Sequence, residues 1–298
     1  MLSVWAYPGD EVAGPISSFD AVSCAVVYHA AEMLLPNGHL RIMTPGARFQ
    51  PDDGYRDLRP PCVAEDAEAA ADRIHAAGRR FHAWTVLLHD DGAVKDAPRQ
   101  QTCFGDPMPH SMCPSDERVR AYCVDLVSDL ASRPWVDAIE LESLYFGLWP
   151  HEWHHAKQAA PVDSAALSTC FCDACCRRAQ AAGVDWRAAQ RQVQERVLRG
   201  GPAVRTEYDS VRSHTITSLM ATLPGRLIIG GSLLPNLWQV GIDAAAWRRR
   251  DLIVTLYGDA ERKEAQAREQ LGAFTRGVLA PGTGDEASVY HLAWLRPT

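Results

Sequence analysis

The stretch "WVDAIELES" (residues 135–143) predicts a buried strand and, through its pattern, the fold class. Glu140 and Glu142 are two residues apart, so they share one side of an extended chain, while Ile139 and Leu141 face the other side. The apolar side suits packing against helices, which leaves both carboxylates on the inner side of a curved sheet. Buried carboxylates are costly unless they are paired or used. We therefore expect a barrel strand with Glu142 at the rim as an acid or base.

Two readings of this glutamate pair stay open. In the first, Glu140 supports Glu142 from one layer lower, and both desolvation and the second carboxylate raise the pKa of Glu142. In the second, the pair is structural and is neutralised by an arginine or histidine from a neighbouring strand. A cation such as Lys157 or a protonated His155 near Glu142 would likewise keep it ionised.

Apolar runs alternate with helical patterns along the whole chain. Alternation of continuous apolar strands with helices predicts a parallel sheet covered on both faces. We expect a TIM-type (β/α)8 barrel in a single domain, 1–298, irregular or incomplete at its C-terminal closure because the last βα unit is short. An open doubly wound sheet is the alternative, although no glycine-rich nucleotide-binding motif supports it. The predicted strands are 2–8, 21–29, 79–89, 135–143, 226–234, 251–258, 276–282 and a weak 288–295; the predicted helices are 64–78, 115–133, 163–199 and 203–222; loops are expected at 35–61 and 90–114.

Composition narrows the possible partners. The 298 residues carry a net charge of −7 and only short basic runs, which argues against a nucleic-acid partner. No apolar stretch approaches the roughly 20 residues that span a bilayer. The N-terminus shows no basic segment followed by an apolar run, so we expect no secretory signal, no membrane association and a cytoplasmic protein with reduced thiols.

Four cysteines crowd into "STCFCDACCRR" (168–178), at positions Cys170, Cys172, Cys175 and Cys176. A disulfide, a redox dithiol and a metal site are the candidates. Zinc takes four thiolate or imidazole ligands in a tetrahedron, and a C-x-C-x-x-C run can supply three of them. No thioredoxin-like context surrounds Cys172 and Cys175, so a metal site with a fourth ligand from elsewhere is favoured.

The loop "GLWPHEWHHAK" (147–157) follows the glutamate strand directly. A sugar presents apolar ring faces and hydroxyl edges, so Trp149 and Trp153 could stack on it while His154 and His155 hydrogen-bond to it. There are two alternatives: the histidines of this loop form a second metal site, or the loop only packs over the mouth of the barrel.

In (β/α)8 barrels chemistry lies at the C-terminal ends of the strands. Polar and aromatic residues gather near those ends here, so we expect them to converge on one pocket. They are Tyr28, His29, Trp84, His89, Glu142, His154, His155 and Tyr257.

Three segments together resemble a known family: "MCPSDERVRAY" (112–122), "AIELES" (138–143) and "CFCDAC" (170–175). They are similar to glycoside hydrolase family 42, the zinc-containing microbial β-galactosidases. They also resemble a broader set of glycoside-hydrolase-like barrels that share an ELE strand, an HHxK loop and a CFCxxC cluster. The resemblance covers about residues 112–176.

The resemblance implies roles for particular residues. Glu142 matches the general acid/base of the family. Four cysteines match the ligands of the family's structural zinc. Such a zinc would attach the excursion 144–200, which follows the fourth strand, to the loop that follows the third strand. The four cysteines are Cys113, Cys170, Cys172 and Cys175.

The chain also departs from the family pattern. Leu141 precedes Glu142 where the family has an asparagine, and the seventh strand is followed only by Asp285 and Glu286, in a predicted loop. Asp259 and Glu140 are the other candidates for a second carboxylate. The sequence therefore predicts either a glycosidase acting on a small glycoside or oligosaccharide, or a non-catalytic carbohydrate-binding or scaffold barrel with a structural zinc.

Overall fold

The computed structural model describes residues 2–6, 16–28, 31–34, 40–43, 46–47, 49–62, 66–90, 92, 94–148, 164–230, 237–243, 246, 253–256, 276–278 and 286–289.

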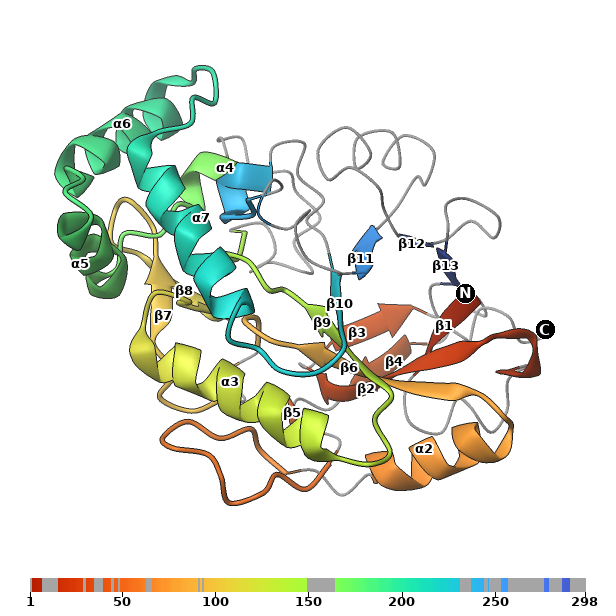
Figure 1. Ribbon diagram of the computed structural model, residues 1–298. Helices are drawn as coiled ribbons and strands as arrows, with labels where there is room; N and C mark the ends of the chain where they lie inside the picture. Colours follow the sequence, from red (N-terminus) through yellow and green to blue (C-terminus); the bar gives the residue numbers. More distant parts are fainter. Residues whose placement is uncertain are drawn as a thin grey trace.

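A ring of eight parallel strands forms the centre of the molecule (Figure 1). Each strand pairs with its neighbours in parallel, and β1 pairs with β2 on one side and with β13 on the other. The predicted TIM-type α/β barrel is confirmed. Seven of the eight predicted strands are present within shorter bounds, whereas the last begins at Glu286, two residues before the predicted 288–295. The eight strands are β1 (Leu2–Ala6), β2 (Ala21–Tyr28), β6 (Arg80–Val86), β9 (Ala138–Glu142), β10 (Leu227–Gly230), β11 (Ile253–Leu256), β12 (Arg276–Val278) and β13 (Glu286–Val289).

Two helices cover the outside of the first half of the ring, along the lower edge in Figure 1. In α2 (Ala67–Ala76), Asp66 caps the N-terminus by accepting from two backbone N–H groups, and Gly78 ends the helix with a φ of 71°. In α3 (Glu117–Ser132), the cap is Asp116. The apolar positions predicted at helical spacing in α3 are all buried: Val119, Tyr122, Cys123, Leu126, Val127 and Leu130.

The excursion after β9 is helical, as predicted, but it contains more helices than expected. The segment 163–199 divides into α4 (Ser164–Leu167), α5 (Asp173–Ala181) and α6 (Trp186–Arg199), and α7 (Glu207–Met220) leads back to β10. The breaks fall at the cysteine run and at Gly183, whose φ of 74° is incompatible with a continuous helix. Helices α5, α6 and α7 project from one side of the barrel (Figure 1).

Short strands lie in or beside both regions that the sequence predicted to be loops, and the first of them ends at Leu34, just before the predicted loop 35–61. They are β3 (Ala31–Leu34), β4 (Leu40–Met43), β5 (Gly46–Ala47), β7 (Arg99–Gln101) and β8 (Pro107–Met112), with single 3-10 turns at η1 (Ile16–Ser18) and η3 (Leu237–Val240). β3 pairs with β4, and β7 with β8, both antiparallel, while β5 pairs with the end of β2. The prolines of β8 weaken a strand pattern in the sequence, which explains why this hairpin was missed.

Two glycines allow the loops beyond β9 to pack closely. A Cβ on Gly147 would lie 2.7 Å from Ser111 Cβ, so this glycine lets the loop after β9 approach β8. Gly241 has a φ of +82°, and a Cβ there would lie 2.8 Å from Phe146 Cδ2. Because only glycine fits this conformation at such short range, η3 can rest against Phe146 and α7. No helix in the described part of the chain has the length and apolar character needed to cross a bilayer.

Candidate functional site

Glu140 points into the barrel, as the alternation in β9 predicted. Its Oε1 accepts a hydrogen bond of 3.0 Å from Trp5 Nε1, and its Oε2 accepts one from Ser23 Oγ. Trp5 lies on β1, which is separated from β9 by two strands, so the contact crosses the interior. The side chain is 1% exposed. An indole and a hydroxyl, both uncharged, thus satisfy both carboxylate oxygens.

Glu142 lies at the C-terminal end of the same strand and is partly exposed. Its Oε2 accepts a hydrogen bond of 2.8 Å from Trp84 Nε1. Trp84 is stacked on Trp5, with ring centroids 4.7 Å apart, and the ring of Tyr28 meets it edge-on at 4.8 Å. The structure therefore brings together three of the predicted pocket residues, Tyr28, Trp84 and Glu142.

The surroundings of Glu142 favour its protonated form. The pKa of Glu142 is raised from 4.5 to about 7, chiefly by burial and to a smaller extent by the nearby Glu140 carboxylate. The hydrogen bond from Trp84 acts in the opposite direction, because it stabilises the carboxylate. The net direction is the one that the sequence predicted, and it leaves a large protonated fraction near neutral pH.

The chain turns sharply just after Glu142. Ser143 has a φ of 61°, a left-handed conformation that is uncommon for a residue with a side chain and often found at functional sites. Tyr145 follows, and burial raises its pKa to about 12, with the charge of Glu142 as the next contribution. The phenol of Tyr145 is thus a protonated group close to Glu142. A backbone hydrogen bond of 2.9 Å from Phe146 to Val240 ties this turn to η3.

The other predicted pocket residues are not brought to Glu142 by the described contacts. His89 forms a backbone bridge to Ser111 in β8, and its ring centroid is 6.1 Å from that of His110. Glu286, expected in a loop, is the first residue of β13. The remaining candidates lie outside the described residues: His29, Trp149, Trp153, His154, His155, Lys157, Tyr257, Asp259 and Asp285.

Sequence reasoning missed Trp5, Ser23 and Tyr145. Trp5 and Ser23 hold Glu140, and they occupy inward positions of β1 and β2. Strand alternation in "LSVWA" and "AVSCAVVY" marks these inward positions, so the signal existed. Tyr145 lies in an irregular turn, where no periodic pattern indicates a direction.

The four predicted cysteines form one buried cluster. The Sγ atoms of Cys113, Cys170, Cys172 and Cys175 all lie within 4.8 Å of one another. Cys113 Sγ is 3.2 Å from Cys172 Sγ and 3.5 Å from Cys175 Sγ. A tetrahedral zinc with Zn–S bonds of about 2.3 Å places its sulfurs about 3.8 Å apart. The cluster is therefore compatible with a metal site, and all nine cysteines are free thiols.

Groups around the cluster suit thiolate ligands. Cys172 occupies the N-cap position of α5, at the helix end where backbone N–H groups favour negative charge. The backbone N–H of Gln101 donates to Cys170 Sγ at 3.4 Å, and Ser115 Oγ lies 3.1 Å from Cys175 Sγ. The hydrogen bond from Cys113, followed by those from the other thiols, lowers the pKa of Cys172. Such contacts from a second layer of residues are typical of protein metal sites.

Burial is the main reason that the pKa values of Cys113 and Cys175 are raised. Cys176 is outside the cluster, with its Sγ 3.4 Å from the carbonyl of Phe171.

The strands of this chain form a (β/α)8-type barrel, and a solved glycoside hydrolase domain shares this fold. The glycoside hydrolase domain of PgaB (BpsB) from Bordetella bronchiseptica matches with a TM-score of 0.55 and 12% identity, over 97% of this chain and 93% of that one. An exo-β-N-acetylglucosaminidase of glycoside hydrolase family 20 from Vibrio harveyi, in complex with N-acetylglucosamine, gives a TM-score of 0.46 and 8% identity, over 93% of this chain and 41% of that one.

These comparisons concern the fold. An α-galactosidase from Thermus thermophilus in complex with stachyose matches with a TM-score of 0.38 and 13% identity, over 99% of this chain and 62% of that one. No family model and no curated protein sequence matches the chain. The likeness to PgaB supports a glycoside-hydrolase-like barrel and does not single out family 42.

Proposed function

We propose that this protein is a glycoside hydrolase in which Glu142 is the general acid. The observation that carries the proposal is the position of Glu142 at the C-terminal end of a barrel strand, with a pKa raised to about 7. A general acid works best when its pKa is near the operating pH. The fold likeness to a glycoside hydrolase domain supports the same class.

In the proposed reaction, the carboxylic acid of Glu142 gives its proton to the glycosidic oxygen as the bond to the anomeric carbon breaks. The hydrogen bond from Trp84 Nε1 at 2.8 Å fixes the carboxyl group and accommodates the carboxylate that forms. Tyr28 and Trp84 are only 7% and 1% exposed, so Trp84, packed against Tyr28, supports Glu142 from within the barrel and offers no open face to a sugar ring.

A second carboxylate is required for either stereochemical outcome. Glu140 is poorly suited to this role, because it is buried and both of its oxygens accept hydrogen bonds from Trp5 and Ser23. We assign Glu140 a positioning role: it holds Trp5, on which Trp84 stacks. Asp259 is then the leading candidate for the nucleophile or base. A separation from Glu142 of about 5 Å would give retention and about 6.5–9.5 Å inversion.

The engagement of Glu140 also favours a second candidate function. If no other carboxylate reaches Glu142, the barrel binds carbohydrate without cleaving it. The two functions differ in turnover but share the site around Glu142.

A panel of aryl glycosides tests the proposal with wild type, Glu142→Gln and the exposed control Glu68→Gln. Loss of a general acid costs about 10²–10⁴-fold for leaving groups that need protonation. We expect a much smaller loss with strongly acidic phenol leaving groups, and no loss for Glu68→Gln. Equal rates for wild type and Glu142→Gln on every glycoside would exclude the acid role. Saturable sugar binding without turnover by wild type would establish the binding function instead.

We further propose that the four-cysteine cluster holds one structural zinc ion. It would link the start of α3 to the start of α5, and so fix the excursion on the barrel. All four ligands are buried and come from two separate segments. Four protein ligands leave no open position, which suits a structural rather than a catalytic ion.

Elemental analysis of purified protein tests this metal assignment. We expect about one zinc per chain in wild type and in the matched control Cys176→Ser, and a marked loss in Cys172→Ser. Metal-free wild type after purification without chelators, or full zinc occupancy in Cys172→Ser, would refute it.

A further inference from the structure

A pocket lies within the excursion, and neither Glu142 nor the cysteine cluster lines it. Its volume is about 350 Å³, which falls in the range of about 300–1,000 Å³ that is usual for small-molecule sites. Its walls come from α4, α6, the 200–206 segment, the start of α7 and η3. The site residues predicted from the sequence do not include any residue of these walls.

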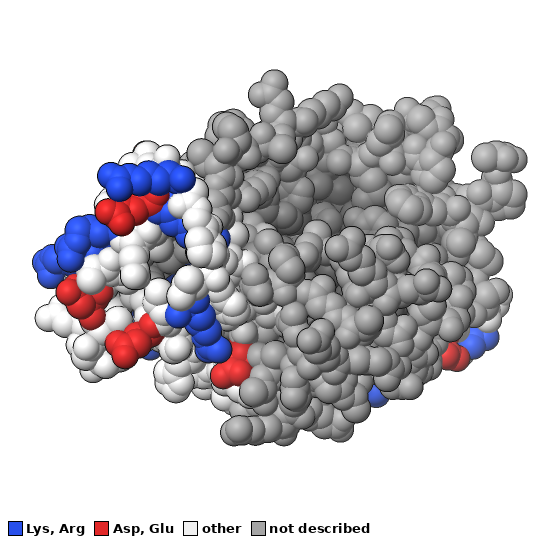
Figure 2. Space-filling view, turned by 90° about the horizontal axis from the view of Figure 1, so that it is seen from above, with Lys and Arg blue, Asp and Glu red and all other residues white. Residues whose placement is uncertain are grey.

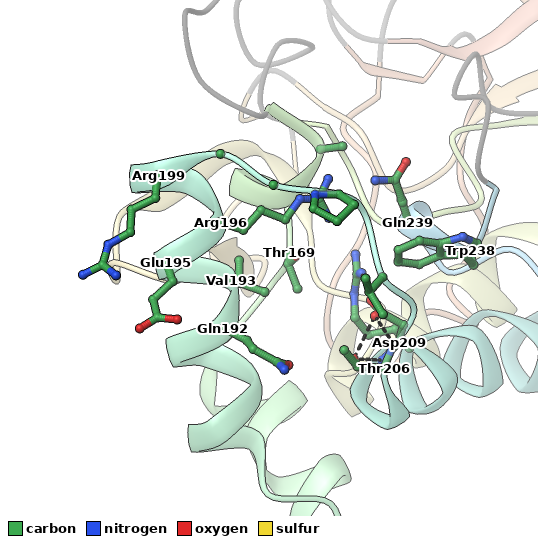
Figure 3. A pocket seen from close by; sticks show the side chains of 16 residues that line it. Thr169, Gln192, Val193, Glu195, Arg196, Arg199, Thr206, Asp209, Trp238 and Gln239 are labelled. Carbon is green, nitrogen blue, oxygen red and sulfur yellow. Dashed lines mark hydrogen bonds and ion pairs between the residues drawn. The ribbon is translucent and has the colours of Figure 1, made fainter.

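Helix α6 contributes polar side chains to one wall. Gln192 and Arg196 are four residues apart, so they share one face of the helix, and both extend toward the cavity (Figure 3). Gln190 and Gln194 also lie on α6, but both donate to the carbonyl oxygen of Cys103, at 3.0 and 2.7 Å. Gln192 is exposed and has no hydrogen-bond partner among the described residues. Its amide is therefore available to a ligand, whereas the amides of Gln190 and Gln194 hold the helix in place.

The 3-10 turn η3 forms the opposite wall, where Trp238 and Gln239 lie next to each other (Figure 3). Trp238 is partly exposed, so part of its ring is open to a ligand, unlike the buried ring of Trp84. A sugar ring has apolar faces and hydroxyl edges, so an accessible aromatic ring with amide groups around it suits a sugar.

No single charge dominates the pocket. Arg212 and Asp209 line it but pair with each other, with 3.2 Å between Nη1 and Oδ1. Glu195 and Arg199 carry opposite charges, and both extend away from the cavity (Figure 3). The described surface over α5 to α7 likewise mixes both signs (Figure 2). Arg196 extends toward the cavity, and a guanidinium donates hydrogen bonds to neutral hydroxyl groups as well as to anions. These features favour a neutral, polyhydroxylated ligand.

The pocket and Glu142 lie toward the same end of the barrel. The chain leaves all parallel strands of a barrel at one end, which Glu142, at the end of β9, shares with η3, which follows β10. In the turn after Glu142, Phe146 donates its backbone N–H to the carbonyl of Val240 in η3, at 2.9 Å. This position suits a site that holds one part of a glycan chain while another part lies at Glu142.

We propose that this pocket binds a neutral oligosaccharide. One sugar ring packs on Trp238, and its hydroxyl groups form hydrogen bonds with Gln192, Gln239 and Arg196. The site contains no residue of the proposed acid machinery. Binding there does not require Glu142 to act as an acid, so a binding assay tests it whether or not the barrel cleaves glycosides.

A glycan array of neutral and anionic oligosaccharides tests the ligand class, with the Glu142→Gln protein as the probe so that bound glycans are not hydrolysed. We expect at least one neutral oligosaccharide to bind, and to bind more strongly than uronic-acid and sulfated glycans. Calorimetric titration with that glycan then tests the residues in the same background. Trp238→Ala should weaken binding by about three- to thirtyfold, and Gln192→Ala by about two- to tenfold. The matched controls outside the pocket, Trp186→Ala and Gln180→Ala, should leave the affinity unchanged.

Gln192→Ala changes an exposed side chain, so it keeps the test valid if Trp238→Ala does not fold. Any of three results overturns the proposal. These are an array on which no neutral oligosaccharide binds, stronger binding of anionic than of neutral glycans, and unchanged affinity in Gln192→Ala or in a folded Trp238→Ala protein. Failure of the acid proposal looks different: wild type then cleaves no aryl glycoside, while the effects of the pocket variants on glycan binding remain.

Discussion

Glu142→Gln should stabilise the protein at alkaline pH and not at acidic pH. The folded-state pKa of Glu142 is about 7, against an ordinary value of 4.5. The protein is then most favoured when Glu142 is protonated, and that stability is lost as pH rises from 4.5 through 7. Since one pKa unit is worth about 1.4 kcal/mol, this group alone lowers the free energy of unfolding by at most about 3 kcal/mol across that range. Glutamine keeps the shape and an acceptor for Trp84 but carries no charge.

Urea denaturation of wild type and Glu142→Gln at pH 4, 5, 6, 7, 8 and 9 measures the effect. The difference in unfolding free energy between the two proteins should be near zero at pH 4, rise between pH 4.5 and 7, and level off above it. Subtracting the two curves removes the contribution of all other titrating groups. Glu68→Gln, at an exposed position, should show a flat difference. A flat difference for Glu142→Gln, or one that favours wild type at pH 9, would refute the reasoning.

Three other perturbations have expected outcomes. Trp84→Phe removes the hydrogen bond that lowers the pKa of Glu142. The pKa that governs the alkaline limb of the pH–rate profile should therefore rise by about one unit, and a fall in that pKa would contradict this. Gly241→Ala should lower the free energy of unfolding by about 1–3 kcal/mol more than Gly78→Ala does. Both glycines have a positive φ, but only a Cβ at position 241 would lie 2.8 Å from Phe146 Cδ2. Equal losses for the two variants in urea denaturation would show that this contact is unimportant. A chelator that removes the proposed zinc should lower the melting temperature, because binding of a structural zinc contributes roughly 10 kcal/mol or more to the free energy of folding. An unchanged melting temperature would mean that the cluster is empty in the native protein.

The sequence predicted the barrel well because each strand carries its own signal. The alternation around Glu140 and Glu142 showed which side faces inward, and the contact between Glu140 and Trp5 across the barrel agrees with it. Helical spacing likewise marked the buried face of α3. These features depend on residues that are close in the chain, so a local pattern was sufficient.

Features that depend on distant segments were harder to foresee. The spacing of Cys170, Cys172 and Cys175 predicted three ligands, but Cys113 was identified only through a family resemblance, because nothing local links it to the others. The pocket around Arg212 was not predicted at all. It forms where α6, α7 and η3 meet, and the sequence of α7 alone shows only a charged residue at a buried helical position.

The bond between Trp5 and Glu140 has a mechanical consequence for the molecule. β1 is the first strand of the barrel and borders the seam with β13, where the backbone of Leu2 to Val4 pairs with that strand. Trp5 also reaches across the lumen to β9 and stacks on Trp84 in β6. If a force separated β1 from β13 at this seam, Trp5 would therefore still hold β1 to β9 and β6 from inside the barrel. The packing beside Glu142 would be kept while the strand ends at the seam moved apart.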